Sequence, residues 1–286
     1  MRGFALGTPT RLAQLFGACA VAFLSMAAAP APTPTVPNFI LDHKSGWRHF
    51  GGKNFVPAPA GFPDMGGLGE HPDHPHIGNN EAAAATKRIG NDGAPILLPW
   101  AREQMQKTRE AIVAGGVPFD PADRCWPAGV PAIITFAVEP LYFLHTPTEV
   151  VMLYQRGQVV RHVYLTRRHT PNLKPSWYGE SIGWFEGETF VVDTIGFSNK
   201  SFVDVFNTPH TEALHTVERY TLVDNGQVLQ AVMVVEDPGT FTRPWAAMKL
   251  HRRTPNVVEE SLCQVNNDDR FGQGLRPVPA AARPDF

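Results

Sequence analysis

Residues 215–235, HTVERYTLVDNGQVLQAVMVV, decide the fold class. Two runs rich in β-branched and apolar residues flank the dipeptide Asn225-Gly226. This dipeptide is the strongest short-range signal of a two-residue hairpin, because both positions of such a turn need a positive φ. The second run is apolar on both faces, as expected of a strand that is covered on both sides. The stretch therefore predicts two antiparallel strands within a larger, covered sheet.

Similar short runs, bounded by turn residues, continue this pattern on both sides of the hairpin. They cover residues 133–138, 141–145, 149–155, 159–165, 181–185, 189–197, 247–251 and 257–262. No helical pattern separates these runs, so the strands are expected to be antiparallel. The sequence predicts a mainly β protein, an antiparallel up-and-down β-barrel of lipocalin-like or calycin-like type with about 8–10 strands.

One helix is expected before the barrel. Pro99 suits the first turn of a helix, an apolar stripe runs from Ala101 to Ile112, and Gly115-Gly116 supplies a stop. Residues 30–98 are rich in Pro, Gly, Ala and His and lack a sustained period, which favours a long irregular N-terminal arm. We expect the helix-plus-barrel domain at 99–265 and an irregular C-terminal tail at 266–286.

Residues 1–29 have the pattern of a signal peptide. Arg2 and Arg11 precede an apolar run that ends in small residues. The alternative is a membrane anchor, but the run is at the short limit for a bilayer span. We expect a periplasmic or secreted protein with no stable membrane insertion after cleavage.

Export changes how the cysteines are interpreted. Cleavage leaves Cys125 and Cys263, an even number in an oxidising compartment, and each flanks one end of the strand-rich region. We predict a disulfide between them. The alternative is two separate buried thiols.

Composition excludes several classes of protein. With 43% hydrophobic and 18% charged residues the chain is neither disordered nor fibrous, and 27 Pro and 25 Gly argue against a helical bundle. A net charge of -2 gives no basic field for a phosphate backbone, so we expect no nucleic-acid partner. No nucleotide-binding or haem-attachment motif occurs, so no cofactor is expected.

Turn positions predict where a site would lie. In an up-and-down barrel successive connections alternate between ends, so tight turns at 156–157, 186–187 and 225–226 share one end, and the longer connections near 146–147, 166–180, 198–213 and 237–245 share the other. This second end, the expected mouth, carries residues suited to acid–base chemistry or ligand contact. They are His145, Arg167, Arg168, His169, Trp177, Tyr178, His210, His215, Asp237, Arg243 and Trp245. Polar loop residues without a chemical role are the alternative.

Two other groups are weighed separately. Glu186 lies on a tight turn and is rejected as catalytic, and Trp184 beside it is expected to plug the barrel interior. His71, His74 and His76 with Asp73 could ligate zinc or copper, but the intervening prolines favour a solvated loop, so no metal site is assigned.

Residues 179–183, Gly-Glu-Ser-Ile-Gly, match the nucleophile elbow of serine hydrolases. Asp193 and His215 follow in the chain order that this fold uses. The elbow needs a strand before the serine and a helix after it, whereas a β-hairpin is expected to follow here. A Ser181, Asp193 and His215 triad is therefore a third option.

An ordered chain of motifs resembles a family of exported proteins found mainly in proteobacteria and acidobacteria, for which no activity is settled. The motifs are PSWYG and SIG from Pro175 to Gly183, VVDT at 191–194, PH at 209–210, LH at 214–215, ER at 218–219, DP at 237–238 and TRPW at 242–245. The similarity covers about residues 95–265. It implies functional roles for His169, Tyr178, Asp193, His210, His215 and Glu218. Phe185 and Thr166-Arg167-Arg168 depart from the family pattern, which leaves the substrate open.

Two function classes follow. The first is an exported enzyme that binds a small apolar or aromatic molecule and uses His169, His210 or His215 with Asp193 or Glu218 for hydrolysis, isomerisation or elimination. Trp177, Tyr178, Asp237, Arg243 and Trp245 would contact the ligand. The second is a lipocalin-like carrier or sensor. The many titratable groups favour the enzyme, a hydrolase, isomerase or lyase.

Overall fold

The computed structural model of the protein describes residues 36–42, 45–50, 55–74, 88–116, 121, 125–136 and 140–255, all within a unit spanning Pro34–Phe286. Its elements are α1 (Asn38–Leu41), β1 (Gly46–His49), β2 (Val56–Pro57), α2 (Pro99–Val113), α3 (Ala132–Phe136), β3 (Leu141–His145), β4 (Glu149–Tyr154), η3 (Arg156–Gln158), β5 (Val159–Tyr164), β6 (Glu180–Glu186), β7 (Thr189–Ile195), β8 (His215–Val223), β9 (Val228–Glu236) and β10 (Trp245–Thr254).

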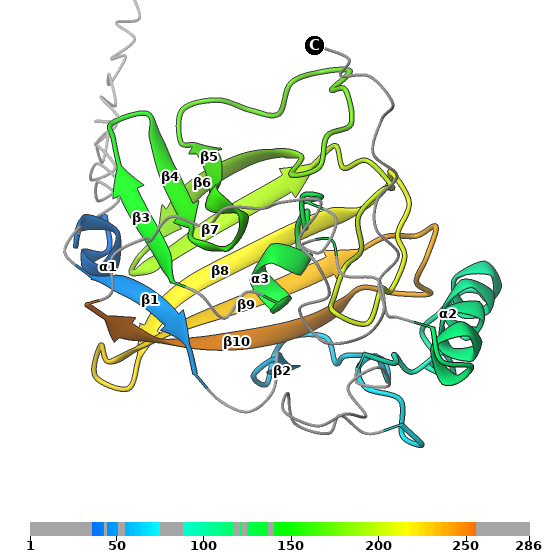
Figure 1. The fold of residues 1–286 in the computed structure, drawn as a ribbon. Coiled ribbons are helices and arrows are strands. Elements are labelled where there is room, and N and C mark those ends of the chain that lie inside the picture. The colour runs from blue at the N-terminus through cyan, green and yellow to red at the C-terminus, as the bar shows by residue number, and fades with distance from the viewer. Residues whose placement is uncertain are drawn as a thin grey trace, which may run out of the picture. The chain divides into compact units, whose positions relative to one another are not determined.

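The strands form a closed barrel, as expected. Nine strands follow one another around it in the order β1-β3-β4-β5-β6-β7-β8-β9-β10, and β1 pairs with β10 to close the ring (Figure 1). The two-residue β2 pairs with β10 outside this ring. The hairpin at Asn225-Gly226 is confirmed, but its connection has four residues, 224–227, and Asp224, Asn225 and Gly226 all have positive φ.

Strand alternation separates the inside of the barrel from the outside. On β8 the buried residues are Thr216, Glu218 and Tyr220, and their neighbours along the strand face outward. In the interior, Phe143 packs edge to face on Phe190 and on Tyr220, with ring centroids 6.4 and 5.5 Å apart, and the tilted rings of Phe190 and Tyr220 lie 6.2 Å apart. Trp184, expected inside, is an exposed side chain because its strand position faces outward.

The expected all-antiparallel topology is wrong at one pair of strands. β5 and β6 run parallel, with Val163 beside Ser181 and Tyr164 beside Ile182. The long connection at 165–179 makes this possible, because it carries the chain out and back to start β6 in the direction of β5. A tight turn could only have reversed the chain.

This parallel pair changes which connections share an end of the barrel. From strand directions, the turn at 155–158 lies with the loops at 196–214 and 237–244, where β6 and β8 begin and β7 and β9 end. We call this the loop end. The turns at 146–148, 187–188 and 224–227 lie at the other end. The turn at 146–147, expected at the mouth, lies at the opposite end from the long loops. The turn at 156–157, expected at the closed end, lies at the loop end.

Two segments differ from the expected elements. Residues 132–136 form α3 where a strand was expected, since a short buried apolar run has no period that distinguishes the two. The buried Lys249 Nζ of β10 donates a hydrogen bond to the Thr135 carbonyl, which supplies a partner for this end of the helix. The expected arm contributes α1, β1 and β2, and Trp47 of β1 is fully buried.

Other expectations have clearer outcomes. α2 is confirmed, with Ala101, Met105 and Ile112 buried along one stripe. The expected strand at 257–262 and Cys263 lie outside the described residues, as do the expected signal peptide and C-terminal tail, so the Cys125–Cys263 disulfide stays a prediction.

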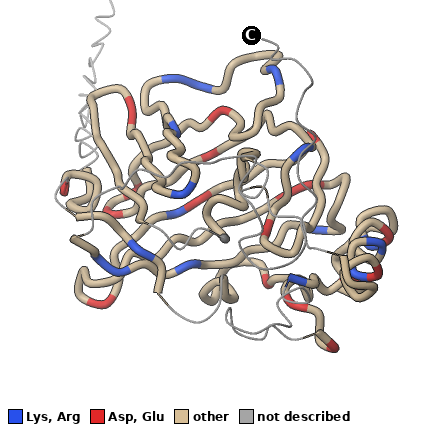
Figure 2. Tube along the Cα trace, viewed as in Figure 1, with Lys and Arg blue, Asp and Glu red and all other residues tan. Residues whose placement is uncertain are grey.

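Charges of both signs are interspersed along the described trace (Figure 2). In that same part of the chain, no helix combines the length and the apolar character needed to cross a bilayer.

Candidate functional site

Four neighbouring strands place a carboxylate or an imidazole at the loop end of the barrel. Glu180 begins β6, Asp193 lies near the end of β7, His215 begins β8 and Glu236 ends β9. The register sets His215 directly beside Glu236. Because β6 and β8 begin where β7 and β9 end, residues far apart in sequence meet at one place.

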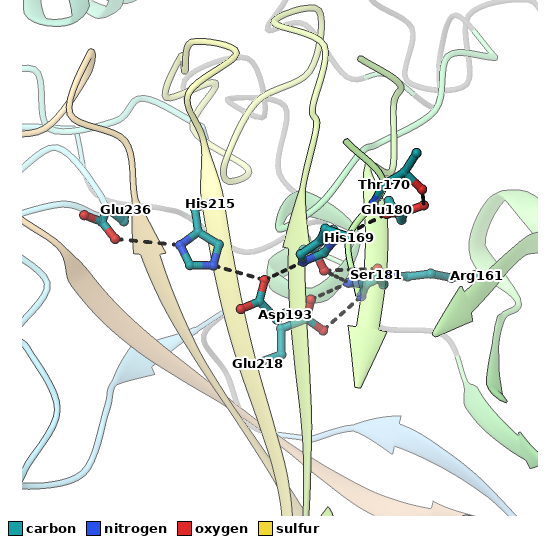
Figure 3. A network of polar contacts seen from close by, with 10 residues as sticks. Arg161, His169, Thr170, Glu180, Ser181, Asp193, His215, Glu218 and Glu236 are labelled. Carbon is teal, nitrogen blue, oxygen red and sulfur yellow. Dashed lines mark hydrogen bonds and ion pairs between the residues drawn. The ribbon is translucent and has the colours of Figure 1, made fainter. Parts of the chain in front are cut away.

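The loop at 165–179 adds His169 to this row. The Nε2 of His169 donates a hydrogen bond to Asp193 Oδ1 at 2.9 Å, and the Nε2 of His215 donates to the same oxygen at 3.2 Å (Figure 3). The Nδ1 of His169 lies 3.5 Å from Glu180, and the Nδ1 of His215 lies 3.7 Å from Glu236. We call these five residues the imidazole row.

The imidazole row faces away from the barrel interior. Thr194 and Thr216, which neighbour Asp193 and His215 along their strands, are fully buried, so alternation turns Asp193 and His215 outward. The side chains of His169, Asp193 and His215 are 19, 22 and 35% exposed. The row is therefore sheltered but accessible from solvent.

Mutual contacts shift the pKa values along the row. The hydrogen bond to Asp193 raises the pKa of His215 above its usual value, although partial burial opposes this. Burial favours a higher pKa for Asp193, but its hydrogen bonds from His215 and His169 outweigh burial and lower it. Burial likewise opposes ionisation of Glu180, while hydrogen bonds from Thr170 lower its pKa. His215 is thus held in its protonated form to a higher pH than a free imidazole.

The arrangement of acceptors explains why protonation is favoured. The His215 ring has a carboxylate beside each of its nitrogens, Asp193 at 3.2 Å and Glu236 at 3.7 Å, and a carboxylate only accepts hydrogen bonds. A neutral imidazole has one proton and would turn a lone pair towards one of these carboxylates. Only the imidazolium presents a donor on both sides, so the row stabilises the form that can give a proton away.

A second polar network lies inside the barrel, behind the imidazole row. Arg161 of β5 makes a two-point ion pair with Glu218, with nitrogen–oxygen distances of 2.9 and 2.6 Å, and both side chains are nearly inaccessible. Its other donors reach Ser181 Oγ at 3.1 Å and Thr194 Oγ1 at 2.8 Å. Burial opposes the charge of Arg161, but the attraction of Glu218 outweighs it and raises the Arg161 pKa. Glu218 therefore belongs to the barrel interior and not to the row.

The structure does not bring Ser181 to His215. Ser181 Oγ lies 3.0 Å from Thr194 Oγ1 in the buried network, whereas His215 makes its contacts on the outer face of the sheet. No helix follows Ser181 either, since it is the second residue of β6. The nucleophile-elbow geometry is absent at this serine.

His210 and Asp237 have local structural partners. Ring nitrogens of His210 lie 2.9 Å from Ser201 Oγ and 2.9 Å from the Thr211 carbonyl, and burial lowers the pKa of His210. Asp237 is buried and accepts hydrogen bonds from Thr211, Gly239 and Thr240. These contacts hold the loops at 196–214 and 237–244 together, so both residues shape the loop end.

The residues expected to contact a ligand lie in different parts of the structure. Trp245 is fully buried in the barrel interior against Phe241, and Arg243 pairs with Asp64 on the surface. Tyr178 is half-buried, which raises its pKa to about 12. Trp177 packs edge to face on Trp126, with ring centroids 5.6 Å apart, and Trp126 is 49% exposed. Among these expected contacts, Trp177 is the one that packs beside an exposed aromatic side chain.

Two histidines of the expected arm contact each other, and one of them also contacts Asp92. The rings of His71 and His74 lie 4.9 Å apart, and His71 Nε2 lies 3.4 Å from Asp92. His76 lies outside the described residues. Within the described part of the chain, no group of three or more His, Cys, Asp or Glu residues is arranged to hold a metal ion.

Sequence reasoning missed four residues of these sites: Glu180, Glu236, Arg161 and Trp126. Glu180 and Glu236 could have been found, because each lies at the end of an expected strand close to a candidate histidine. The inward position of Arg161 could not be predicted, because a single basic residue on a strand does not show which face of the sheet it lies on. Comparisons of the chain with protein-family models, with curated proteins and with solved structures found no match.

Proposed function

We propose that this protein is an exported enzyme that acts on a small molecule with an apolar or aromatic part, with His215 as the proton donor. The observation that carries the proposal is the sharing of Asp193 Oδ1 by the Nε2 atoms of His169 and His215. A general acid must hold its proton near the working pH and must be reachable by the substrate. His215 meets both conditions, because its pKa is raised and its side chain is the most exposed of the three.

The proton passes to an oxygen or carbon of the substrate, a step that hydrolysis, isomerisation and elimination have in common. In an ester hydrolysis, water adds to the carbonyl carbon and the bond to the leaving oxygen breaks. His215 supplies the proton to that oxygen, and the proton lost by the attacking water restores the imidazolium. Asp193 stays ionised throughout and stabilises the imidazolium.

Trp126 and Trp177 support an aromatic or apolar part of the substrate. Trp177 lies three residues before Glu180, so its Cα is at most about 11 Å from that of Glu180, even for an extended chain. A half-exposed Trp keeps apolar surface in water, and an aromatic ring stacked on it would remove that surface from solvent. The closeness of Trp177 to Glu180 supports an aromatic contact near that end of the row.

A lipocalin-like carrier is the second candidate. The observation in its favour is that every ring nitrogen of His169 and His215 already faces a carboxylate. Such a row could simply stabilise the loop end while a ligand binds without reaction. The two candidates differ in whether His215 is needed for turnover.

Hydrolysis of phenyl acetate by the mature protein tests the enzyme. Phenolate is a basic leaving group, so its departure benefits from a proton donor. We expect turnover that declines as pH rises through the His215 pKa, and a loss of at least about tenfold in His215→Ala, within the usual contribution of acid–base catalysis.

The matched control is His162→Ala. His162 also pairs with a carboxylate, Glu149, at 2.8 Å, and it lies beside Glu180, but its strand β5 is three strands away from His215 of β8. It should keep the parent rate. Equal rates in the parent and His215→Ala would reject the acid function and favour the carrier.

A further inference from the structure

The loop at 165–179 is anchored on both sides of its path. The Ser176 amide donates to the Gly196 carbonyl at 2.9 Å, and the Ser198 amide donates to the Ser176 carbonyl at 2.8 Å. These bonds fix the second half of the loop beside the end of β7. The first half, which carries His169, needs its own anchor.

Glu180 provides that anchor. Its Oε1 accepts a hydrogen bond from the Thr170 amide at 2.7 Å, and its Oε2 accepts one from Thr170 Oγ1 at 2.8 Å. Arg167 lies 3.6 Å from the same carboxylate. Glu180 itself is fixed as the first residue of β6, where it pairs with Ile195 of β7. A rigid strand end thus holds the residue next to His169 by two strong bonds.

We infer that Glu180 is a positioning residue that acts through His169: by holding Thr170 it keeps His169 on Asp193 Oδ1, so that His215 never has this oxygen to itself (Figure 3). The inference deepens the proposed function, because it assigns Glu180 the control of the proton donor. The role of this control in catalysis rests on the proposed function, whereas the contacts of Glu180 and His169 do not.

The groups that face His215 set the sign of the effect. They are Asp193 from β7, Glu236 from β9 and, through the shared oxygen, His169 from the loop. If His169 leaves, the whole of Asp193 Oδ1 becomes available to His215. This change favours the protonated form of His215 and raises its pKa further. Losing a carboxylate such as Glu180 by its charge alone would instead lower it.

The test is the titration of His215 by NMR in the mature protein, with no substrate present. We expect the midpoint to move upward in His169→Ala and in Glu180→Ala, and by a smaller amount in Thr170→Val, which removes one of the two bonds to Glu180. In the double variant His169→Ala/Glu180→Ala the midpoint should not rise above that of His169→Ala.

Glu186→Ala is the matched control. Glu186 ends the same strand, β6, and bonds Arg219 and Trp184 at the opposite end. It should leave the His215 midpoint unchanged. A downward or absent shift in Glu180→Ala and Thr170→Val, or an equal upward shift with His169 already removed, would overturn the inference. Because no turnover is measured, failure here is distinct from failure of the phenyl acetate test.

Discussion

His169 and His215 donate hydrogen bonds to one and the same oxygen atom, Oδ1 of Asp193. His169 lies on a long loop and His215 is the first residue of β8. The Asp193 carboxylate therefore joins two parts of the chain that are far apart in sequence. Because one carboxylate carries a single charge, the two rings compete for it. The hydrogen bond that His215 makes to Asp193 therefore depends on the position of His169.

Replacing Asp193 by Asn should lower stability in a pH-dependent way. The folded pKa of His215 is raised, so its contribution is complete below its usual value of 6.5 and is lost as pH rises through the folded pKa. The folded pKa of Asp193 is lowered, so its contribution is present above 3.8 and is lost as pH falls through the folded pKa. Urea unfolding should show the largest difference from the parent near pH 5, at most about 1 kcal/mol because the pair is partly exposed.

The same comparison at about pH 9, well above the usual imidazole range, should give a smaller difference. A deficit that is constant from pH 5 to pH 9 would mean that Asp193 acts only as a neutral hydrogen-bond acceptor.

Breaking the buried ion pair should cost far more than breaking an exposed one. Glu218→Gln leaves the Arg161 charge buried without its counter-ion, and we expect a loss of about 3–5 kcal/mol in urea unfolding. Arg219→Gln at the exposed pair with Glu186 is the control, and it should lose less than about 1 kcal/mol. Similar losses in the two variants would contradict the buried placement of Arg161 and Glu218.

Ser181→Ala separates a structural hydroxyl from a nucleophile. The hydroxyl accepts a hydrogen bond from Arg161 Nε inside the barrel, and its removal leaves that donor without this partner. We expect about 1–3 kcal/mol lower stability in urea and no loss of phenyl acetate turnover at a temperature where the variant is folded. Covalent labelling of Ser181 by a fluorophosphonate would instead support a serine hydrolase mechanism.

Trp126 and Trp177 should report aromatic ligands. A planar probe such as 1,8-ANS that stacks on this pair should quench tryptophan fluorescence, and replacing Trp126 by Ala should weaken its binding at least about tenfold, the equivalent of 1.4 kcal/mol. Trp184→Ala is the control, because Trp184 is similarly exposed but lies near the far end of β6. Unchanged affinity in Trp126→Ala would place the ligand elsewhere.

The predicted disulfide between Cys125 and Cys263 is testable on denatured protein. Thiol titration of the unreduced mature chain should find no free thiol, and two reactive thiols would exclude the bridge. If the bridge forms, Cys263→Ser should lower stability by about 2–5 kcal/mol, because the bridge closes a long loop.

The sequence supports the barrel because its signals are local. The Asn225-Gly226 turn and the alternating runs around it need no distant contact, and β8 was predicted with the bounds it has. Closure by β1 could not be predicted, since Gly46–His49 is short and lies in a Pro- and Gly-rich segment. Its pairing with β10 decides its structure, and this pairing is remote in sequence.

The site was predicted only in part, for a similar reason. His169 and His215 were both expected at the mouth, and the structure brings them to one carboxylate. That carboxylate, Asp193, was a candidate only through the family resemblance and the serine triad, and it was not expected at the mouth. His210 and Asp237 were expected beside the two histidines, yet His210 bonds Ser201 and the Thr211 carbonyl within its own loop, and Asp237 bonds Thr211 between two loops. Residue type and loop position do not reveal which polar side chains satisfy local backbone groups and which reach across strands.

The closing pair of strands also sets the order in which the molecule can fold. Gly46 of β1 lies beside Thr254 of β10, so the ring cannot close until almost the whole described chain has been synthesised. Until then the edge of β1 that pairs with β10 has no partner strand, and an unpaired edge is a template for pairing with other chains. Bringing together ends so distant in sequence is entropically slow, and high contact order lengthens folding times. An unclosed ring therefore exposes strand edges that can pair between copies until β1 and β10 meet.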